Sequence, residues 1–325
     1  MSLVADVTMH GVDPATKSDT LRMEFSDMQT LFNGLNITLE QNVPLGPRTW
    51  YGVGGNAEYL VHPSSIQQLA AITQQAYQAQ IPLYVLGSGA NLLVSDAGVK
   101  GIVVVLDDPA FKQLSIEGNR VRVGAGYDLA KLVLDTARAG LSGLECLAGI
   151  PATVGGAIRM NAGGAYGDIG KSVYRIQAMD VRGQVYYRDR DDLVFSYRKS
   201  NIVAKFILEA EFELSPDSPD DLSKRVKEIF LYKKNSQPLA DHSAGCAFKN
   251  PPSEVGATAG QLIDRAGLKG FGIGGARVSE QHANFIVATK GQTTASDILA
   301  VMKKVQETVY EKFGVELERE VVVWE

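Results

Sequence analysis

The hydrophobic positions of this chain fall into two kinds of pattern, short continuous runs and stripes at helical spacing. The runs YLV, YVL and IVVVL have glycine or proline nearby and are typical of buried strands. The stripes, such as the one through Ile298, Val301 and Val305, predict amphipathic helices. Strands are expected at 56–62, 82–86, 102–106, 120–123, 174–179, 185–187, 205–214, 283–288 and 315–324. A first element is expected at 25–32, and helices at 64–77, 129–137, 222–234, 262–266 and, with Ser296 as its cap, 296–309.

The elements follow a β-α-β order early in the chain, then glycine-rich loops, then hairpins. Such an order indicates an α+β fold more than a regular doubly wound sheet. The segment SPDSP at 215–219 predicts a boundary or hinge. Residues 1–25 are polar and lack sustained periodicity, and we expect a mobile arm there. The chain should therefore divide into an arm (1–25), a first domain (26–215) and a second domain (216–325).

Composition and charge exclude several classes of protein. Of the 325 residues, 45% are hydrophobic and 21% are charged, which excludes a largely disordered chain. A net charge of −5 lacks the basic excess of a nucleic-acid binder, so we expect no nucleic-acid partner. No apolar run approaches the ~18 residues of a membrane helix, and residues 1–25 do not have the pattern of a secretory signal. Cys146 and Cys246 form neither a metal-spaced cluster nor a disulfide framework, which favours a reduced, cytoplasmic compartment and no metal site.

The glycines are both abundant and clustered. There are 33 of them, about a tenth of the chain against an average of ~7%. Bunched glycines indicate backbone that turns sharply or approaches a ligand closely. In GSGAN, at 87–91, successive N–H groups can form a nest for a diphosphate, with a plain turn as the alternative. The small residues of 149–167 would let backbone lie against a flat ring system, with a tightly packed loop as the alternative.

Six motifs in a fixed order make the sequence resemble a known family. They are GSGANLLVSD, GIPATVGGAIRMNAGGAYG, FSYRKS, SAGCAFKNP, AGLKGFGIGGARVSEQHANFIV and ELEREV. Over residues 45–325 the chain resembles the UDP-N-acetylenolpyruvoylglucosamine reductases, flavoenzymes of bacterial peptidoglycan precursor synthesis. The resemblance implies an FAD-binding domain in two lobes, of the vanillyl-alcohol-oxidase type, and a C-terminal substrate-binding domain. The short spacing between Asn250 and the helix near Leu262 resembles the type that lacks a tyrosine-bearing loop.

The resemblance also implies a reaction and its partners. NADPH reduces a non-covalently bound FAD, and the flavin then passes hydride to UDP-N-acetylglucosamine enolpyruvate, which becomes UDP-N-acetylmuramate. The enzyme would act on small molecules in the cytoplasm, and we expect a monomer. Hydride addition at the β-carbon drives negative charge toward the substrate carboxylate. The site therefore needs a cation near that carboxylate and an acid that protonates the α-carbon.

Three residues match the family's catalytic positions. Arg198, in FSYRKS, would stabilise the carboxylate charge as a planar cation with several donors. Cys246, in SAGCAFKNP, stands where the family usually has a serine proton donor. A thiol, with an ordinary pKa of about 8.5, is a competent acid, although a packing role is the alternative. Glu320, in ELEREV, would orient or relay the proton, and Glu318 shares its strand face and is the fallback.

The binding residues are carried over from the same motifs. The expected FAD contacts are Tyr51, Gly87, Ser88, Gly89, Ala90, Asn91, Leu92, Gly149, Ile150, Thr153, Asn161, Ala162, Gly163, Tyr166 and Gly167. The expected substrate contacts are Tyr197, Lys234, Lys249, Asn250 and His282. A solvated lysine is the alternative for Lys234, and a structural histidine is the alternative for His282. Ala152 replaces a usual glycine of the family, and we expect it to shift the flavin-loop backbone slightly.

Two other functions fit part of these features. The first is an alcohol or sugar oxidase of the same fold. Several such oxidases tether FAD through a histidine near the diphosphate loop, but His10, His62, His242 and His282 all lie outside the loop at 87–91. The second is an FAD- or nucleotide-binding module that has lost catalysis, which only the cysteine at position 246 supports. Such a module would bind flavin without oxidising NADPH in a substrate-dependent way.

Overall fold

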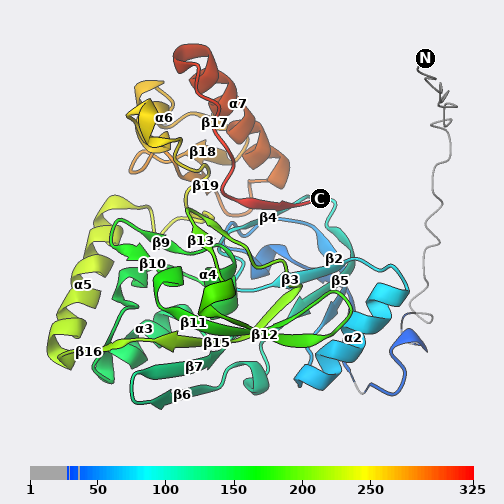
Figure 1. Ribbon diagram of the computed structural model, residues 1–325. Helices are drawn as coiled ribbons and strands as arrows, with labels where there is room; N and C mark the ends of the chain where they lie inside the picture. The colour runs from blue at the N-terminus through cyan, green and yellow to red at the C-terminus, as the bar shows by residue number, and fades with distance from the viewer. Residues whose placement is uncertain (1–27, 29, 36) are drawn as a thin grey trace, which may run out of the picture.

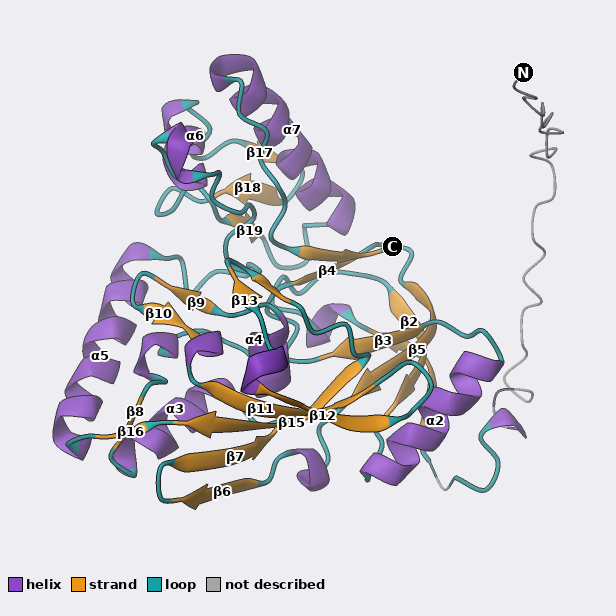
Figure 2. Ribbon diagram, viewed as in Figure 1, coloured by secondary structure: helices purple, strands orange, loops and turns teal. Residues whose placement is uncertain are grey.

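The computed structural model describes residues 28, 30–35 and 37–325, which form three units (Figure 1). The first two units are each built on a sheet, and the third, smaller unit rises above them in the view of Figure 1. Helices and strands are mixed along the chain, as Figure 2 shows, so the α+β class is confirmed. The expected arm at 1–25 lies outside the described residues.

The first unit is a four-stranded sheet in the order β1-β2-β5-β3, with helix α2 packed on one face. Its elements are β1 (Leu39–Pro44), β2 (Asn56–Val61), α2 (Ile66–Gln78), β3 (Leu83–Leu86) and β5 (Val99–Val105). Strand β5 runs parallel to both β2 and β3, whereas β1 is antiparallel to β2. Ile102 of β5 packs on the α2 side and Val103 on the opposite side. Burial on both faces explains why the run at 102–106 is continuously apolar.

The second unit is a five-stranded antiparallel sheet in the order β12-β11-β15-β7-β6. Its strands are β6 (Leu114–Glu117), β7 (Arg120–Gly124), β11 (Val173–Met179), β12 (Val185–Asp189) and β15 (Phe206–Glu213). Helices α3 (Leu129–Arg138), α4 (Val154–Arg159) and α5 (Pro219–Ser236) share one hydrophobic core with this sheet. The expected hairpin within 174–187 is the β11–β12 pair.

Helix α5 belongs to the second unit by its packing, although the sequence places it in the next domain. Its side chains Leu222, Val226 and Ile229 are buried in the core of the five-stranded sheet, and the helix packs on α3. The expected boundary motif at 215–219 contains Ser218, the N-cap of α5. The packing therefore favours a boundary after Ser236 in place of the expected one at residue 215.

The third unit packs two helices on a three-stranded sheet in the order β17-β18-β19. Its elements are α6 (Ala259–Arg265), β17 (Gly272–Ile273), β18 (Ala276–Val278), β19 (Ile286–Ala288) and α7 (Ala295–Phe313). The expectation that Ser296 caps α7 is wrong, because Thr294 is the N-cap and its side chain accepts a hydrogen bond from Asp297 N. Ser296 instead donates its hydroxyl proton to Asp96 at 2.6 Å, which ties α7 to the segment after β4.

The last strand returns to the first unit. Strand β20 (Val322–Trp324) pairs in parallel with β4 (Leu92–Val94), and in Figure 1 the C-terminus lies beside β4. Only this final part of the expected strand at 315–324 is regular, although Arg319 forms an isolated bridge with Phe248. Asn91 Nδ2 donates to Glu320 O at 3.2 Å. The pairing thus brings the segment of Glu320 to the loop that follows β3.

Three further two-stranded sheets are each made of two-residue strands. They are β8 (Leu141–Ser142) with β16 (Ser215–Pro216), β9 (Gly163–Gly164) with β10 (Gly167–Asp168), and β13 (Phe195–Ser196) with β14 (Lys199–Ser200). In the part of the chain that the structure describes, no helix combines the length and the apolar character needed to cross a membrane.

Candidate active site

Three segments from different parts of the chain bring Arg198, Cys246 and Glu320 together. Arg198 occupies the two-residue turn between β13 and β14, where its φ of +53° is unusual for a residue with a side chain. Cys246 lies after α5 and forms an isolated bridge with Phe285. Glu320 lies just before β20, and its N–H donates to Ala247 O at 2.9 Å. A positive φ at a turn that carries a functional arginine is the kind of local strain that gathers at active sites.

Arg198 and Glu320 form a partly buried ion pair. Arg198 Nε donates to Glu320 Oε1, and the two side chains are 18% and 12% exposed. Burial works to lower the pKa of Arg198, but the Glu320 carboxylate outweighs it and holds that pKa above its ordinary value. Burial raises the pKa of Glu320, against the opposing charges of Arg198 and Lys249. The pair leaves the terminal guanidinium nitrogens of Arg198 without an acceptor among the described residues.

The thiol of Cys246 is close enough to this pair for both charges to act on it. Burial, followed by the Glu320 carboxylate, raises the pKa of Cys246 to about 12, while Arg198 and a hydrogen bond with Asn284 act the other way. The group therefore keeps its proton at neutral pH, which is the form that a proton donor requires. Asn284 also fixes the segment, because its side chain bonds both Phe248 N and Phe248 O.

The two glutamates of the last motif have different surroundings. Glu318 is 72% exposed and pairs with Lys249 Nζ at 2.5 Å. Glu320 is enclosed and faces Arg198. Between them, Arg319 forms the isolated bridge with Phe248, and the two carboxylates form ion pairs with different cations. The structure brings Glu320, and not Glu318, to the expected catalytic arginine.

The loop at 87–91 has the geometry of an anion site. A Cβ on Gly89, whose φ is +67°, would lie 2.1 Å from Arg48 O, so only glycine fits there. The N–H groups of Ser88, Gly89 and Ala90 donate to no acceptor among the described residues. Gly87 faces the second glycine loop, since its Cβ would lie 2.8 Å from Thr153 Oγ1. Free N–H groups in a tight turn fit the diphosphate of a dinucleotide.

The second glycine loop, 149–167, surrounds helix α4. Thr153 caps this helix by accepting a hydrogen bond from Gly156 N. Asn161 is buried with a φ of +44°; it donates to Ser196 O at 2.9 Å and accepts from Gly170 N at 3.0 Å. Asn161 therefore joins this loop to the turn that carries Arg198. The two glycine loops touch, and their small residues fit a flat cofactor that bridges the two lobes.

The remaining expected cofactor contacts have varied surroundings. Tyr51 is 1% exposed and packs in the core of the third unit, where burial raises the pKa of its hydroxyl. Leu92 begins β4 and is buried. Ile150 and Ala162 are half-buried against the core of the second unit. Tyr166 is exposed and lies edge-on to Tyr232 of α5, with ring centroids 5.6 Å apart. Gly149, Gly163 and Gly167 are half-buried in the second loop.

The expected substrate residues divide into two groups. Tyr197, Lys249 and Asn250 lie together near the ion pair, because the Tyr197 hydroxyl accepts from Asn250 N at 3.2 Å. Lys234 is exposed at the end of α5, with its carbonyl oxygen facing Gln281 Nε2 at 3.5 Å. His282 is half-buried, accepts from Asn284 N at 3.2 Å, and has a pKa lowered by burial. The structure gives His282 a local structural partner, while its contact with substrate stays a prediction.

Sequence reasoning missed two residues beside the site. Asn284 is 3% exposed and holds the backbone next to Cys246. Lys233 is 6% exposed and donates to the carbonyl of Ala148, at the entry of the second glycine loop. The sequence carried a signal for Lys233, since it falls on the apolar face of α5. Nothing in the sequence alone separates Asn284 from a surface asparagine.

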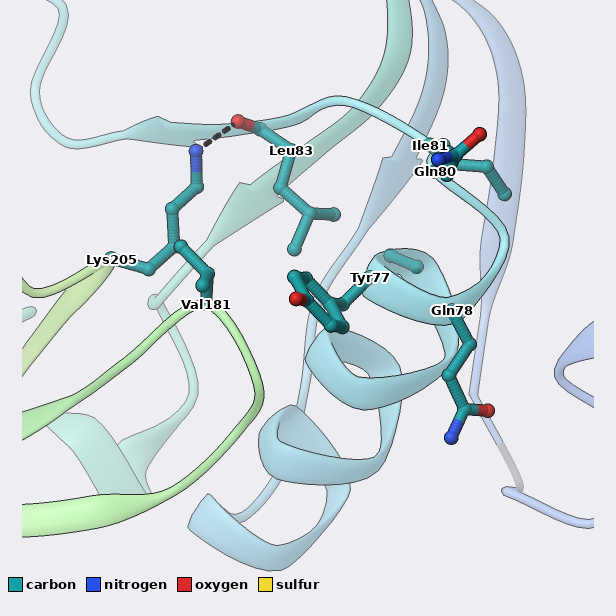
Figure 3. A pocket seen from close by; sticks show the side chains of 8 residues that line it. Tyr77, Gln78, Gln80, Ile81, Leu83, Val181 and Lys205 are labelled. Carbon is teal, nitrogen blue, oxygen red and sulfur yellow. Dashed lines mark hydrogen bonds between the residues drawn. The ribbon is translucent and has the colours of Figure 1, made fainter.

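A separate cavity of about 470 Å³ lies between the end of α2, strand β3 and the β11–β12 turn (Figure 3). Tyr77, Leu83 and Val181 line it, and Lys205 Nζ donates to Leu83 O at its wall. None of the expected site residues lines this cavity. Among residues 28, 30–35 and 37–325, no group of three or more acidic, histidine or cysteine side chains could hold a metal ion.

Comparison with known proteins decides the family. The chain is 39% identical over 295 residues to the UDP-N-acetylenolpyruvoylglucosamine reductase of Moorella thermoacetica, covering 90% of this chain and 96% of that one. It is 37% identical over 296 residues to the protein of the same name from a Bradyrhizobium species, covering 91% and 95%. The chain belongs to the UDP-N-acetylenolpyruvoylglucosamine reductase family. The resemblance read from the six motifs is thereby confirmed.

Structure and family models agree with this membership. The crystal structure of the reductase from Thermus caldophilus matches with a TM-score of 0.77 and 38% identity, over 89% of this chain and all of that one. A model described as an FAD binding domain matches residues 57–187, which include both glycine loops. A model of the C-terminal domain of UDP-N-acetylenolpyruvoylglucosamine reductase matches 237–324, which include Cys246 and Glu320. This second match begins directly after α5.

Proposed function

We propose that this reductase-family chain binds FAD non-covalently and uses NADPH to convert UDP-N-acetylglucosamine enolpyruvate to UDP-N-acetylmuramate. The observation that carries the proposal is the meeting of Arg198, Cys246 and Glu320 beside two glycine loops. A cation, a protonated acid and a carboxylate in one enclosed place are the groups that conjugate addition to an enolpyruvyl carboxylate needs. Family membership supports the choice of this substrate.

The cofactor would be held by backbone more than by side chains. The free N–H groups at 88–90 would receive the diphosphate, and the loop at 149–167 would lie along the ring system. When bound and reduced by NADPH, the flavin would supply the hydride that reaches the β-carbon of the enolpyruvyl group. The expected contacts Tyr51, Asn91 and Asn161 also carry structural hydrogen bonds or packing, so their substitution would disturb the loops along with any cofactor contact.

Arg198 would act on the developing charge. Its Nε is engaged by Glu320, so the guanidinium plane is held while the terminal nitrogens stay available to the substrate carboxylate. The ring of Tyr197 lies 5.0 Å from the guanidinium and restricts it further. A preorganised cation loses little free energy to reorganisation when charge appears on the carboxylate.

Cys246 would give its proton from Sγ to the α-carbon. Its raised pKa keeps the thiol protonated until the carbon becomes basic, and Arg198 stabilises the thiolate that remains. Glu320 raises the pKa of the thiol and holds Arg198 by its ion pair, and its expected role in orienting or relaying the proton stays a prediction. Tyr197, Lys249 and Asn250 would hold the UDP-sugar at the edge of this site, with Lys234 and His282 as outer contacts.

We further propose that the protein works as a monomer in the cytoplasm on small molecules alone. Two free cysteines support a reducing compartment, and the net charge of −5 supports the absence of a nucleic-acid partner. Sedimentation of the purified protein checks the oligomeric state, and a dimer would overturn that part of the proposal.

The test of function is an absorbance assay on purified protein. We expect flavin bands, release of all flavin on acid precipitation, and loss of NADPH absorbance only when the UDP-enolpyruvyl sugar is present. Flavin that stays with the acid pellet would favour a tethered oxidase. Bound flavin with no substrate-dependent NADPH oxidation would favour a module without catalysis.

A further inference from the structure

Helix α5 carries a lysine on its buried face. Leu222, Val226 and Ile229 form the stripe that packs in the core of the second unit, and Lys233 continues the stripe at helical spacing. Its side chain is 6% exposed, whereas that of the next residue, Lys234, lies in solvent. Because an ammonium group loses its hydration in such a position, it needs polar partners there.

The partners of Lys233 are backbone carbonyl groups. Its Nζ donates to Ala148 O at 2.7 Å and faces Cys146 O at 3.4 Å. Both carbonyls belong to the end of a short 3-10 helix, η3 (Glu145–Leu147), where carbonyl oxygens lack partners within the helix. No acidic side chain among the described residues forms an ion pair with Lys233. The ammonium group of Lys233, on α5, therefore caps the free carbonyl groups at the C-terminal end of η3.

The chain turns at that point into the second glycine loop. Gly149 has a φ of +76°, and a Cβ there would lie 3.3 Å from Phe230 Cδ2 and 3.4 Å from Lys233 Cδ. At the other end of the segment, Thr153 Oγ1 would lie 2.8 Å from a Cβ on Gly87. The stretch 149–153 thus spans the distance from α5 to the candidate diphosphate loop. Its entry is held by α5, and Lys233 supplies the polar contact there.

We propose that Lys233 is a positioning residue for the flavin. The ammonium group of Lys233 fixes the entry of the loop against which the flavin ring would lie. The proposal rests on the proposed function. It assigns to Lys233 a task distinct from the substrate contact expected of Lys234. Burial lowers the pKa of Lys233 to about 8, with Cys146 opposing and the charge of Arg198 adding to the shift. The amine is thus mostly protonated at neutral pH.

The test compares three variants of the flavin-loaded enzyme. Lys233→Met removes the donor and keeps the length, Lys233→Arg restores a cationic donor, and Lys227→Met is a control at an exposed lysine of the same helix. The measurements are the rate of flavin release on dilution, the visible flavin spectrum, and kcat and KM for the UDP-enolpyruvyl sugar. We expect Lys233→Met to release flavin at least about tenfold faster, because two buried acceptors lose their donor. We also expect its flavin spectrum to shift while KM for the sugar stays unchanged.

The controls separate a positioning role from a purely structural one. Lys233→Arg should approach the parent, and Lys227→Met should match it. If Lys233→Met loses heat stability but keeps the parent's flavin release and spectrum, Lys233 is structural only and the proposal falls. If Lys233→Met does not fold, Lys233→Gln, which removes the charge and shortens the side chain, takes its place, and parent-like flavin release from it overturns the proposal. A parent enzyme that holds no flavin would instead refute the proposed function.

Discussion

The thiol of Cys246 should react with a small disulfide much more slowly than a free cysteine does. Burial and the Glu320 carboxylate raise the pKa of Cys246 to about 12, and only the thiolate attacks a disulfide. Near pH 8 the thiolate fraction is then about 10⁻⁴, against about 10⁻¹ for an ordinary thiol. The more basic thiolate is the better nucleophile by about twentyfold. The net expectation is a reaction about 50-fold slower than that of free cysteine.

The neighbouring charges give this prediction a direction as well as a size. Glu320→Gln removes a negative charge that opposes ionisation of Cys246, so the pKa of the thiol should fall and the reaction should speed up. Arg198→Met removes a cation that favours the thiolate, so the reaction should slow further. Glu320→Gln keeps the size of the side chain, whereas Arg198→Met opens space beside the thiol. A faster reaction in the first variant and a slower one in the second therefore follow electrostatics and not access.

The assay needs a protein with one thiol. Cys146, whose own pKa burial raises to about 11, is replaced by serine in every variant. An aromatic disulfide that releases a coloured thiol reports the rate, and mass spectrometry verifies modification at Cys246. A rate within a few-fold of free cysteine, or a slower reaction in Glu320→Gln, would show that the proposed electrostatic environment of Cys246 does not hold.

Three further results are expected. Turnover of the UDP-enolpyruvyl sugar by Cys246→Ala should fall by about 10²–10⁴-fold while NADPH still reduces the flavin, and Cys246→Ser should retain much of the activity. If substrate reoxidises prereduced Cys246→Ala at the parent rate in stopped flow, the thiol is only a packing group. Gly89→Ala should lose flavin, because its Cβ would clash with Arg48 O, whereas Gly118→Ala, also at positive φ but with open space around it, should keep flavin; equal flavin content in both would contradict the clash. Burial works to raise the pKa of Asp96, but hydrogen bonds from the first turn of α7 outweigh it and hold that pKa below its usual value. The stability that these hydrogen bonds give is therefore present at neutral pH and is lost as acid protonates the carboxylate below about pH 4. Asp96→Ala should accordingly lower the free energy of unfolding by about 1 kcal/mol at neutral pH, and by progressively less as acid protonates Asp96, measured by urea denaturation.

Local patterns predicted the elements well where one face or two faces of a strand are buried. The strand at 102–106 and the buried face of α7 could be predicted from their own residues. The N-cap of α7 could not, because it depends on a distant segment. Ser296 and Thr294 are both good caps by residue type, and the choice depends on Asp96, which approaches from a segment 200 residues away and takes the Ser296 hydroxyl.

The candidate site was predictable as a set of motifs and less so as a set of contacts. The motif around Arg198 identifies the residue, but its ion pair with Glu320 joins positions 122 residues apart and appears only in the folded chain. Two adjacent lysines at the end of α5 look alike in sequence. Helical spacing from Leu222 selects Lys233 as the inward one, a distinction that depends on knowing which side of α5 meets the second unit.

The parallel pairing of β20 with β4 has a consequence for how the protein is made. Asn91 and Glu320, which this pairing joins, are separated by 229 positions in the chain. During synthesis at about 5–20 residues per second, the edge of β4 therefore waits many seconds for its partner strand to leave the ribosome. An unpaired edge next to apolar Leu92 and Leu93 is a place where nascent chains can associate with one another. Newly made protein should thus depend on chaperones during that interval, and catalytic competence should be acquired in one late step when β20 docks.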